Sequence, residues 1–394
     1  MLASSVRPYF VCLTSLLSAL TWAQIPGLVA DKPYDLGGYV KYMASANIVE
    51  QGDDYYDHLI HQRFNFEYRF DEAFRVNLSM RNRVLWGDSA KLPGYNTLIG
   101  ADAGYWDLTT NWLERGSVIG TSQFDRAYVQ WSDNDWQLRV GRSRINWAMN
   151  AIWNPNDVFN AYSIYDFDYE ERSGTDALSV TRKLDFASSI DVVFSPNQES
   201  DLTSYAGRYL YNYQGWDMQV IAGKSNLDRI LGGGVAGDIK GAGVRAEVSW
   251  FEPTKERWND VELSSTTVAS IESDYSFTSR RNWMGRIAYL YISQPQSADS
   301  AAKYLNLPLN AKTLSFSRNT YYADVGFDLS PLWRATFSTV YYQDHSYYLS
   351  LNSHYSLSDD IQLIGVIQKF DGSEDSLFGE TPATLLFAQI KWSF

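Results

Sequence analysis

The stretch 382–394 reads PATLLFAQIKWSF, and its side chains alternate in character from one residue to the next. Apolar residues occupy one set of alternate positions, namely Leu386, Ala388, Ile390, Trp392 and Phe394. The other set is mostly polar and consists of Phe387, Gln389, Lys391 and Ser393. A period of two residues predicts a β-strand with one apolar and one polar face. We expect this strand to run to the last residue, so that it ends on an aromatic side chain.

The same alternation recurs along most of the chain. It is clearest at 64–80, where two alternating runs flank a short turn at 71–73. Further strand pairs are predicted at 123–131/135–142, 175–183/187–195, 203–213/216–224, 229–239/241–251, 265–277/282–292, 318–329/332–342 and 346–357/360–370. With 36–46 and 382–394 these give about eighteen strands, within a range of 16–18. Connections within most pairs are short, and long ones are expected at 85–122, 143–174, 252–264, 293–317 and 371–381.

This pattern predicts an all-β fold, a transmembrane antiparallel up-and-down β-barrel. Aromatic residues make up 15% of the chain, and no apolar run is long enough for a membrane-spanning helix. A barrel explains both facts, because only alternate residues face lipid and aromatic girdles lie at the two interfaces. The net charge of −13 argues against nucleic-acid binding.

The N-terminus has the pattern of a secretory signal. Arg7 precedes an apolar run at 9–20, and small residues follow near Ala23. We therefore expect a signal peptide at 1–23 and the barrel at 24–394. The only cysteine, Cys12, lies within the signal, so the mature chain is expected to contain neither a disulfide nor a thiolate metal site.

Both ends of the chain resemble those of Gram-negative outer-membrane β-barrels. In that class the last strand closes the barrel, and its terminal aromatic residue belongs to the assembly signal. The resemblance implies location in the bacterial outer membrane and contact with its lipid and lipopolysaccharide. It also implies recognition of the strand ending at Phe394 by the barrel-assembly machinery. A homo-oligomer is left open.

The most distinctive segment is 141–176, GRSRINWAMNAIWNPNDVFNAYSIYDFDYEERSGTD. An exposed loop would leave its many aromatic residues in water, so we expect 143–174 to fold inward as a constriction segment. Its candidate residues are Trp147, Trp153, Asp157, Tyr165, Asp166, Asp168 and Glu170. The run Gly-Arg-x-x-Ile-x-Trp…Trp-Asn-Pro-x-Asp resembles a recurrent segment of porin-like barrels of Gram-negative bacteria, including alginate-export-like families. Ala148 stands where that pattern has glycine.

Arginines are frequent on the predicted lumen face of the early strands. The candidate pore-lining residues are Arg63, Arg69, Arg75, Arg81, Arg126, Arg139, Arg142 and Arg144. Inward carboxylates are expected elsewhere, at Glu272, Asp274, Asp324 and Asp328. A basic wall opposite an acidic wall would orient polar solutes and favour one sign of charge. An equally weighted reading is that the arginines pair with neighbours such as Glu67 and serve packing.

The favoured function is a channel for diffusion of small hydrophilic solutes, with anions or saccharides as a refinement. We expect no catalytic residue, metal or cofactor. Gly232, Gly234 and Gly237 match a dinucleotide-binding motif formally, but residues typical of a strand follow them instead of a helix. The alternatives are a transporter of hydrophobic compounds, an outer-membrane enzyme, and a structural or adhesive barrel with a packed lumen.

Overall fold

The computed structural model describes residues 32–168, 174–296 and 298–394. The predicted signal peptide at 1–23 lies outside these ranges, as does Glu170 of the predicted constriction segment.

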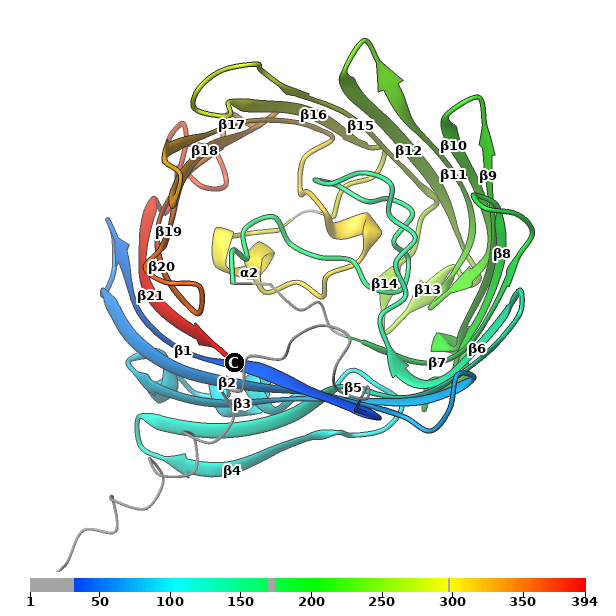
Figure 1. The fold of residues 1–394 in the computed structure, drawn as a ribbon. Coiled ribbons are helices and arrows are strands. Elements are labelled where there is room, and N and C mark those ends of the chain that lie inside the picture. The colour runs from blue at the N-terminus through cyan, green and yellow to red at the C-terminus, as the bar shows by residue number, and fades with distance from the viewer. Residues whose placement is uncertain (1–31, 169–173, 297) are drawn as a thin grey trace, which may run out of the picture.

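One antiparallel sheet of nineteen strands forms the molecule, and it closes on itself because β1 pairs with both β2 and β21 (Figure 1). Among the described residues β4 pairs only along β5, so eighteen strands make up the ring. The predicted all-β up-and-down barrel and its strand number are therefore confirmed. The strands are β1 (Tyr34–Val49), β2 (Tyr55–Arg69), β3 (Phe74–Gly87), β4 (Thr109–Arg115), β5 (Val118–Asp133), β6 (Trp136–Ser143), β7 (Thr175–Lys183), β8 (Ser189–Ser195), β9 (Ser204–Tyr213), β10 (Trp216–Ser225), β11 (Asp228–Ile239), β12 (Ala242–Pro253), β15 (Thr266–Ser276), β16 (Met284–Ile292), β17 (Asn319–Ser330), β18 (Trp333–Tyr342), β19 (Tyr347–Ser356), β20 (Ile361–Asp371) and β21 (Ala383–Ser393), with β13 (Arg257–Trp258) and β14 (Val261–Glu262) as a separate hairpin.

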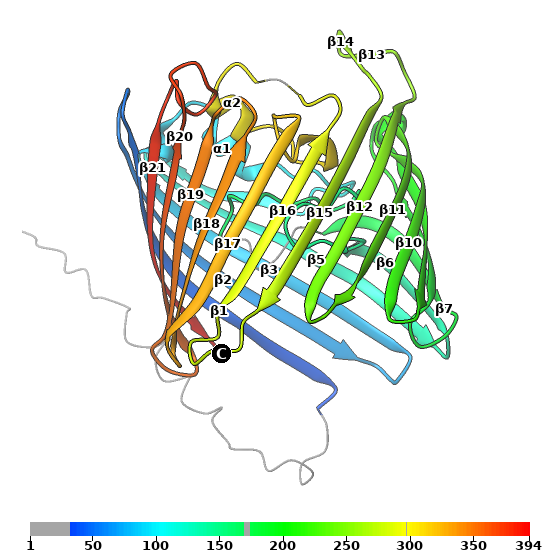
Figure 2. The same ribbon diagram turned by 90° about the horizontal axis from the view of Figure 1, so that it is seen from above.

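The two ends of the barrel differ in the length of their connections. The C-terminal residue lies at one end, and α2 (Ala301–Leu305) and the β13–β14 hairpin lie at the other (Figure 2). Tight turns join strands at the C-terminal end; Gln214 and Gly215, for example, have φ of 52° and 83°. Two consecutive positive φ values are typical of two-residue hairpin turns, whose twist matches that of the strands. This is the predicted asymmetry of short turns and long loops.

The long connection predicted at 85–122 contains α1 (Tyr95–Gly100) and the strand β4, and β5 begins within it at Val118. None of the described helices is long and apolar enough to cross a membrane.

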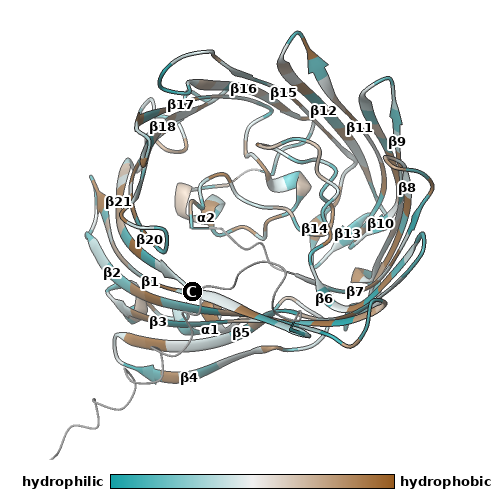
Figure 3. Cartoon of the chain, viewed as in Figure 1, coloured by the Kyte–Doolittle hydropathy of each residue, from teal (hydrophilic) through white to brown (hydrophobic). Residues whose placement is uncertain are grey.

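The outer face of the ring is apolar. Val140, Val220, Phe337 and Ile367 each expose about half of their surface there, between 43% and 56%. Hydrophobic and hydrophilic residues alternate along most strands (Figure 3). The two-residue period thus places apolar side chains outside and most polar ones inside.

The interior is partly filled. Two long connections, residues 144–168 and the described residues 293–296 and 298–318, lie within the ring in Figure 1. They pack against inward residues of the wall in one buried cluster that includes Ile145, Trp153, Ile221, Leu290, Tyr304, Tyr342 and Phe378. We refer to residues 144–168 as the inner segment.

Candidate functional site

Two buried glutamates on the wall hold the first half of the inner segment. Glu247 on β12 and Glu272 on β15 are 3% and 2% exposed. Their carboxylates accept five backbone N–H groups, from residues 149–152 and from Asn156. Asn156 N donates to Glu247 Oε2 at 3.0 Å, and Ala151 N donates to Glu272 Oε1 at 2.7 Å. Charge-assisted bonds of this kind offset the cost of burying a carboxylate.

Glycines on β11 let the inner segment approach the wall. Ser249 Oγ donates to Asn156 Oδ1 at 2.7 Å, directly beside Gly232. A Cβ at Gly232 would lie 2.8 Å from that Oδ1, and a Cβ at Gly234 would lie 2.9 Å from Met149 Sδ. These glycines, which formally matched a nucleotide motif, instead make room for the inner segment.

The aromatic residues of the inner segment pack against the wall. Trp147 is 3% exposed, and its ring centroid lies 5.2 Å from that of Phe159. Trp153 is 1% exposed and lies 6.0 Å from the ring of Tyr322 on β17. Asp157 is 1% exposed within the same part of the segment. These side chains therefore belong to the packed interior.

The second half of the inner segment crosses to β1, β20 and β21. Gln368 Nε2 donates to the carbonyl oxygen of Tyr165 at 2.8 Å, and the Tyr165 hydroxyl bonds that of Tyr342. Phe167 follows, with its ring centroid 4.5 Å from that of Phe387. The backbone then turns, because Asp168 N donates to Asp166 Oδ1 at 3.1 Å.

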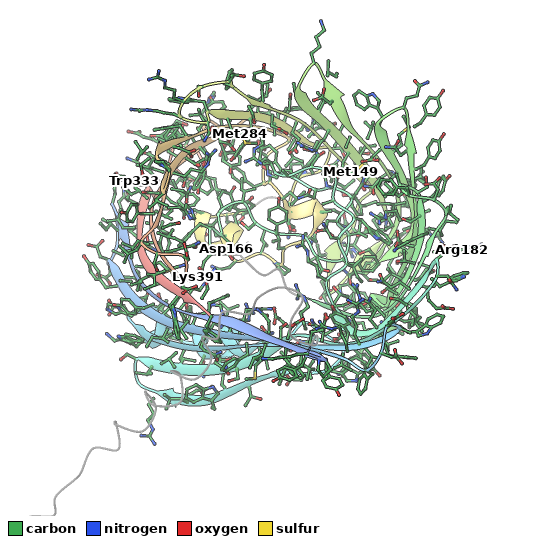
Figure 4. The ribbon with its side chains drawn as sticks, in the orientation of Figure 1. Met149, Asp166, Arg182, Met284, Trp333 and Lys391 are labelled. Atoms are coloured by element: carbon green, nitrogen blue, oxygen red, sulfur yellow. The ribbon has the colours of Figure 1, made fainter. Side chains whose placement is uncertain are left out.

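This turn meets a row of basic side chains, which we call the basic row: Lys391, Lys41, His61 and Arg83. They are consecutive register partners on β21, β1, β2 and β3. Lys41 is 1% and His61 is 7% exposed. Lys41 Nζ forms an ion pair with Asp168 Oδ1. Asp166 is exposed, and Figure 4 shows it inside the ring, whereas Trp333 and Arg182 lie at the outer edge.

A second row of inward residues lies next to the basic row along the same strands. Arg63 on β2 is the register partner of Arg81 on β3. Arg63 is 1% exposed and donates through NH1 to Asp125 Oδ2 at 2.8 Å. Arg81 donates through Nε to the amide oxygen of Gln123 at 2.8 Å, so its partner there is neutral.

The other predicted arginines on the lumen face are occupied by neighbours. Arg126 lies 3.6 Å from the Asp125 carboxylate, and Arg139 donates to Gln130 Oε1 at 2.9 Å. Arg69 and Arg75 lie beside the turn at 70–73 and approach Glu67 Oε1 at 3.1 and 3.9 Å. Pairing with Glu67 is the alternative that the sequence analysis left open for the arginines.

Arg142 lies near the end of β6 and lines the same polar cavity as Arg81. On β6 it shares the alternation of Trp136 and Val140, which are exposed on the outer face, yet it is only 3% exposed. Arg142 donates to Asp176 Oδ1 at 2.8 Å and to Asp102 Oδ2 at 2.7 Å. It therefore fastens the connection at 102–106 to the wall. Arg144 follows β6 at the start of the inner segment.

Asp102 lies in that connection, outside the strands. Burial raises its pKa, but hydrogen bonds from Arg142, from the backbone N–H groups of Gly104 and Leu108 and from Thr109 outweigh burial and lower the pKa to about 2. Asp102 therefore stays ionised over the range in which proteins are usually handled.

The four carboxylates of the predicted acidic wall are paired with three arginines. Asp274 pairs with Arg245, which also lies 3.1 Å from Glu272. Asp324 pairs with Arg286 and Asp328 with Arg334, each at 2.8 Å. We did not single out these three arginines, although each is the register partner of one of these carboxylates. The sequence reading also missed Lys41, His61, Arg83 and Glu247. Knowledge of the strand register could have found them.

A polar cavity of about 470 Å³ lies between the inner segment and the wall. Arg81, Gln123 and Asp125 line it from the wall, and Phe159–Ala161 line it from the inner segment. Ser225–Asn226 belong to its rim, between β10 and β11 at the end with the long loops. The described residues contain no group of three or more His, Cys, Asp or Glu that could hold a metal ion.

No family model matches the sequence, and no curated protein matches it significantly. Solved structures are similar in fold. Acinetobacter baumannii OccAB1 has a TM-score of 0.58 and 10% identity, over 92% of this chain and 97% of that chain. Pseudomonas aeruginosa OpdQ has a TM-score of 0.57 and 9% identity, over 92% and 99%. The outer membrane protein OprD from Pseudomonas aeruginosa has a TM-score of 0.55 and 10% identity, over 92% and 94%. At such identities the likeness concerns the fold, and it is the fold of an outer-membrane type of barrel.

Proposed function

We propose that the protein is an outer-membrane channel through which small hydrophilic solutes diffuse, with anions favoured over cations. The observation that carries this proposal is the polar cavity that reaches Arg81, in the row of wall residues next to the basic row. A solute that enters from the loop end would meet this wall after passing the inner segment.

The preference for anions follows from the local charge. The chain as a whole carries a net charge of −13, but Lys41, Arg81, Arg83 and Lys391 gather on three neighbouring strands, β1, β3 and β21. On the opposite wall three arginines pair with the four carboxylates Glu272, Asp274, Asp324 and Asp328, so the acidic charge there offsets this field only in part. Walls of low dielectric constant focus such a field into a water-filled lumen and raise the local concentration of counter-ions.

The inner segment supports a constriction. It is attached to β12 and β15 through Glu247 and Glu272 and reaches Lys41 on β1 through Asp168. A rigid bridge between separated parts of the wall narrows the space through which solutes pass. The aromatic residues Trp147 and Trp153 are packed away from the cavity, which favours hydrophilic over hydrophobic cargo.

The apolar outer face supports placement in a lipid bilayer. We further propose the signal peptide at 1–23, contact with outer-membrane lipid and lipopolysaccharide, and recognition of β21 and Phe394 by the assembly machinery.

Swelling of liposomes that contain the purified barrel tests the proposal. We expect a small organic anion to enter faster than a neutral sugar of similar size, and both to enter faster than a comparable organic cation. Empty liposomes give the background rate. Swelling no faster than that background for every solute would show that the barrel is not a channel.

A further inference from the structure

We propose that Asp168 is an internal competitor for the anion site of this channel. Its carboxylate occupies the basic row in the resting protein, and a permeating anion displaces it from Lys41. This inference rests on the proposed function and describes how the same site is regulated.

The basic row is a built site. Its four residues lie on the inner face of adjacent strands, where side chains of register partners have Cβ atoms about 5 Å apart. Lys391 and Lys41 are direct register partners, and like charges placed opposite each other destabilise a sheet, so this part of the row is more stable when an anion lies against it. Asp168 supplies one negative charge, through its contact with Lys41.

Two further side chains at this place have unused hydrogen-bonding groups. His61 is 7% exposed, and no described residue bonds its Nε2. Gln389 on β21 is 5% exposed, and neither polar atom of its side-chain amide has a partner among the described residues. Gln389 precedes Lys391 by two residues and so shares its inward face. A buried polar group without a partner is costly, and an anion with its water shell would satisfy both groups.

The turn at 166–168 lies closer to water than the first half of the inner segment. Asp166 is exposed, and the Asp168 side chain is 18% exposed. The segment before the turn is fixed separately, by the bond from Gln368 to Tyr165 and by the packing of Phe167 on Phe387. Asp168 can therefore leave Lys41 by a side-chain rotation, while the backbone of the inner segment stays in place.

The exchange is balanced in charge. The ion pair between Lys41 and Asp168 breaks, a pair between Lys41 and the solute forms, and the released carboxylate becomes hydrated in the lumen. Neutral solutes cannot drive this exchange, because they offer Lys41 no negative charge. The competitor therefore weakens anion binding and prevents a tightly bound anion from blocking the lumen.

The test compares Asp168→Asn with Asp328→Asn. The control also removes one inward negative charge, but Asp328 pairs with Arg334 on β18, away from the basic row. Chloride current is measured in planar bilayers as a function of salt concentration. We expect the concentration that gives half-maximal current to fall about tenfold in Asp168→Asn and to stay unchanged in Asp328→Asn. Equal behaviour of the two variants would overturn the proposal.

A second measurement separates this inference from the proposed function. Line broadening in chloride NMR reports chloride binding to the detergent-solubilised barrel whether or not it conducts. Asp168→Asn should bind chloride more tightly than the wild type, and Lys41→Gln in the same chain should abolish that gain. Tighter binding without any current would refute the channel but keep the competitor. Unchanged binding in a folded variant would refute the competitor alone.

Discussion

The two halves of the inner segment meet the wall through opposite arrangements of charge. In the first half, wall carboxylates of Glu247 and Glu272 accept backbone N–H groups, and both are almost fully buried. In the second half, the segment supplies the carboxylate, and the wall supplies Lys41. That second contact lies at the edge of the lumen, where Asp166 is exposed.

This difference separates an anchor from an exchangeable contact. Backbone N–H groups cannot leave a buried carboxylate without moving the chain, and a buried charge that loses its partners is costly. A side chain at the edge of water can exchange partners at much lower cost, because solvent replaces what it loses. The first half therefore sets the position of the segment, and the second half responds to solutes.

The largest effect is expected when the anchor is broken. Replacing Glu247 and Glu272 together by Gln turns acceptor oxygens into donors that face other donors, at a cost of about 1–3 kcal/mol for each unsatisfied group. We expect a marked fall in melting temperature in detergent and a several-fold rise in conductance. Glu262→Gln, at a site whose side chain is 78% exposed, is the matched control. Unchanged conductance in the double variant would show that the inner segment does not limit the passage.

Removing positive charges from Arg81 and Arg83 should change the ion selectivity of the channel and leave its unfolding free energy nearly unaltered. Arg81→Gln with Arg83→Gln removes two positive charges from the lumen, so the preference for anions should fall several-fold. Reversal potentials in a salt gradient measure it. Arg182→Gln is the control, because Arg182 lies at the outer edge of the ring over Trp136. An equal change of the reversal potential in the double variant and in Arg182→Gln would show that Arg81 and Arg83 do not set the ion selectivity.

A smaller effect is expected from the glycines beneath the anchor. Gly232→Ala places a Cβ 2.8 Å from Asn156 Oδ1 and should lower the unfolding free energy by about 1–3 kcal/mol. At Gly233 the nearest atom would be 3.5 Å away, so Gly233→Ala should be neutral or slightly stabilising. Thermal unfolding of Gly232→Ala and Gly233→Ala measures the difference. Equal melting temperatures of the two variants would contradict close packing of the inner segment on β11.

The smallest effect concerns the contact of Asp102 with Arg142, which fastens the connection at 102–106 to the wall. Its folded pKa of about 2 lies below the unfolded value of about 3.9, so its ionised form stabilises the protein above that value. The stabilisation is lost as the pH falls toward 2. The melting temperatures of wild type and Asp102→Asn should therefore differ at pH 7 and converge near pH 2. The control is Asp359→Asn, in an exposed turn, whose melting temperature should equal that of the wild type at both pH values. If the melting temperatures of wild type and Asp102→Asn differed by the same amount at every pH, the stabilising role of ionised Asp102 would be contradicted.

The sequence was sufficient to predict the barrel, because the two-residue period is a local property of each strand. It also singled out the segment that carries Trp147 and Asp168. It could not show that Lys391, Lys41, His61 and Arg83 form one row, since each is an isolated polar residue until the strand register is known. For the same reason the pairing of Asp324 with Arg286 was missed.

The reversal potential of the wild-type barrel in a potassium chloride gradient tests the central claim most directly. A chain with a net charge of −13 would favour cations if its overall charge governed the lumen. The basic row predicts instead an open channel that favours chloride over potassium, so the reversal potential should have the sign of the chloride equilibrium potential. A silent barrel, or a reversal potential of the sign that potassium sets, would contradict the account.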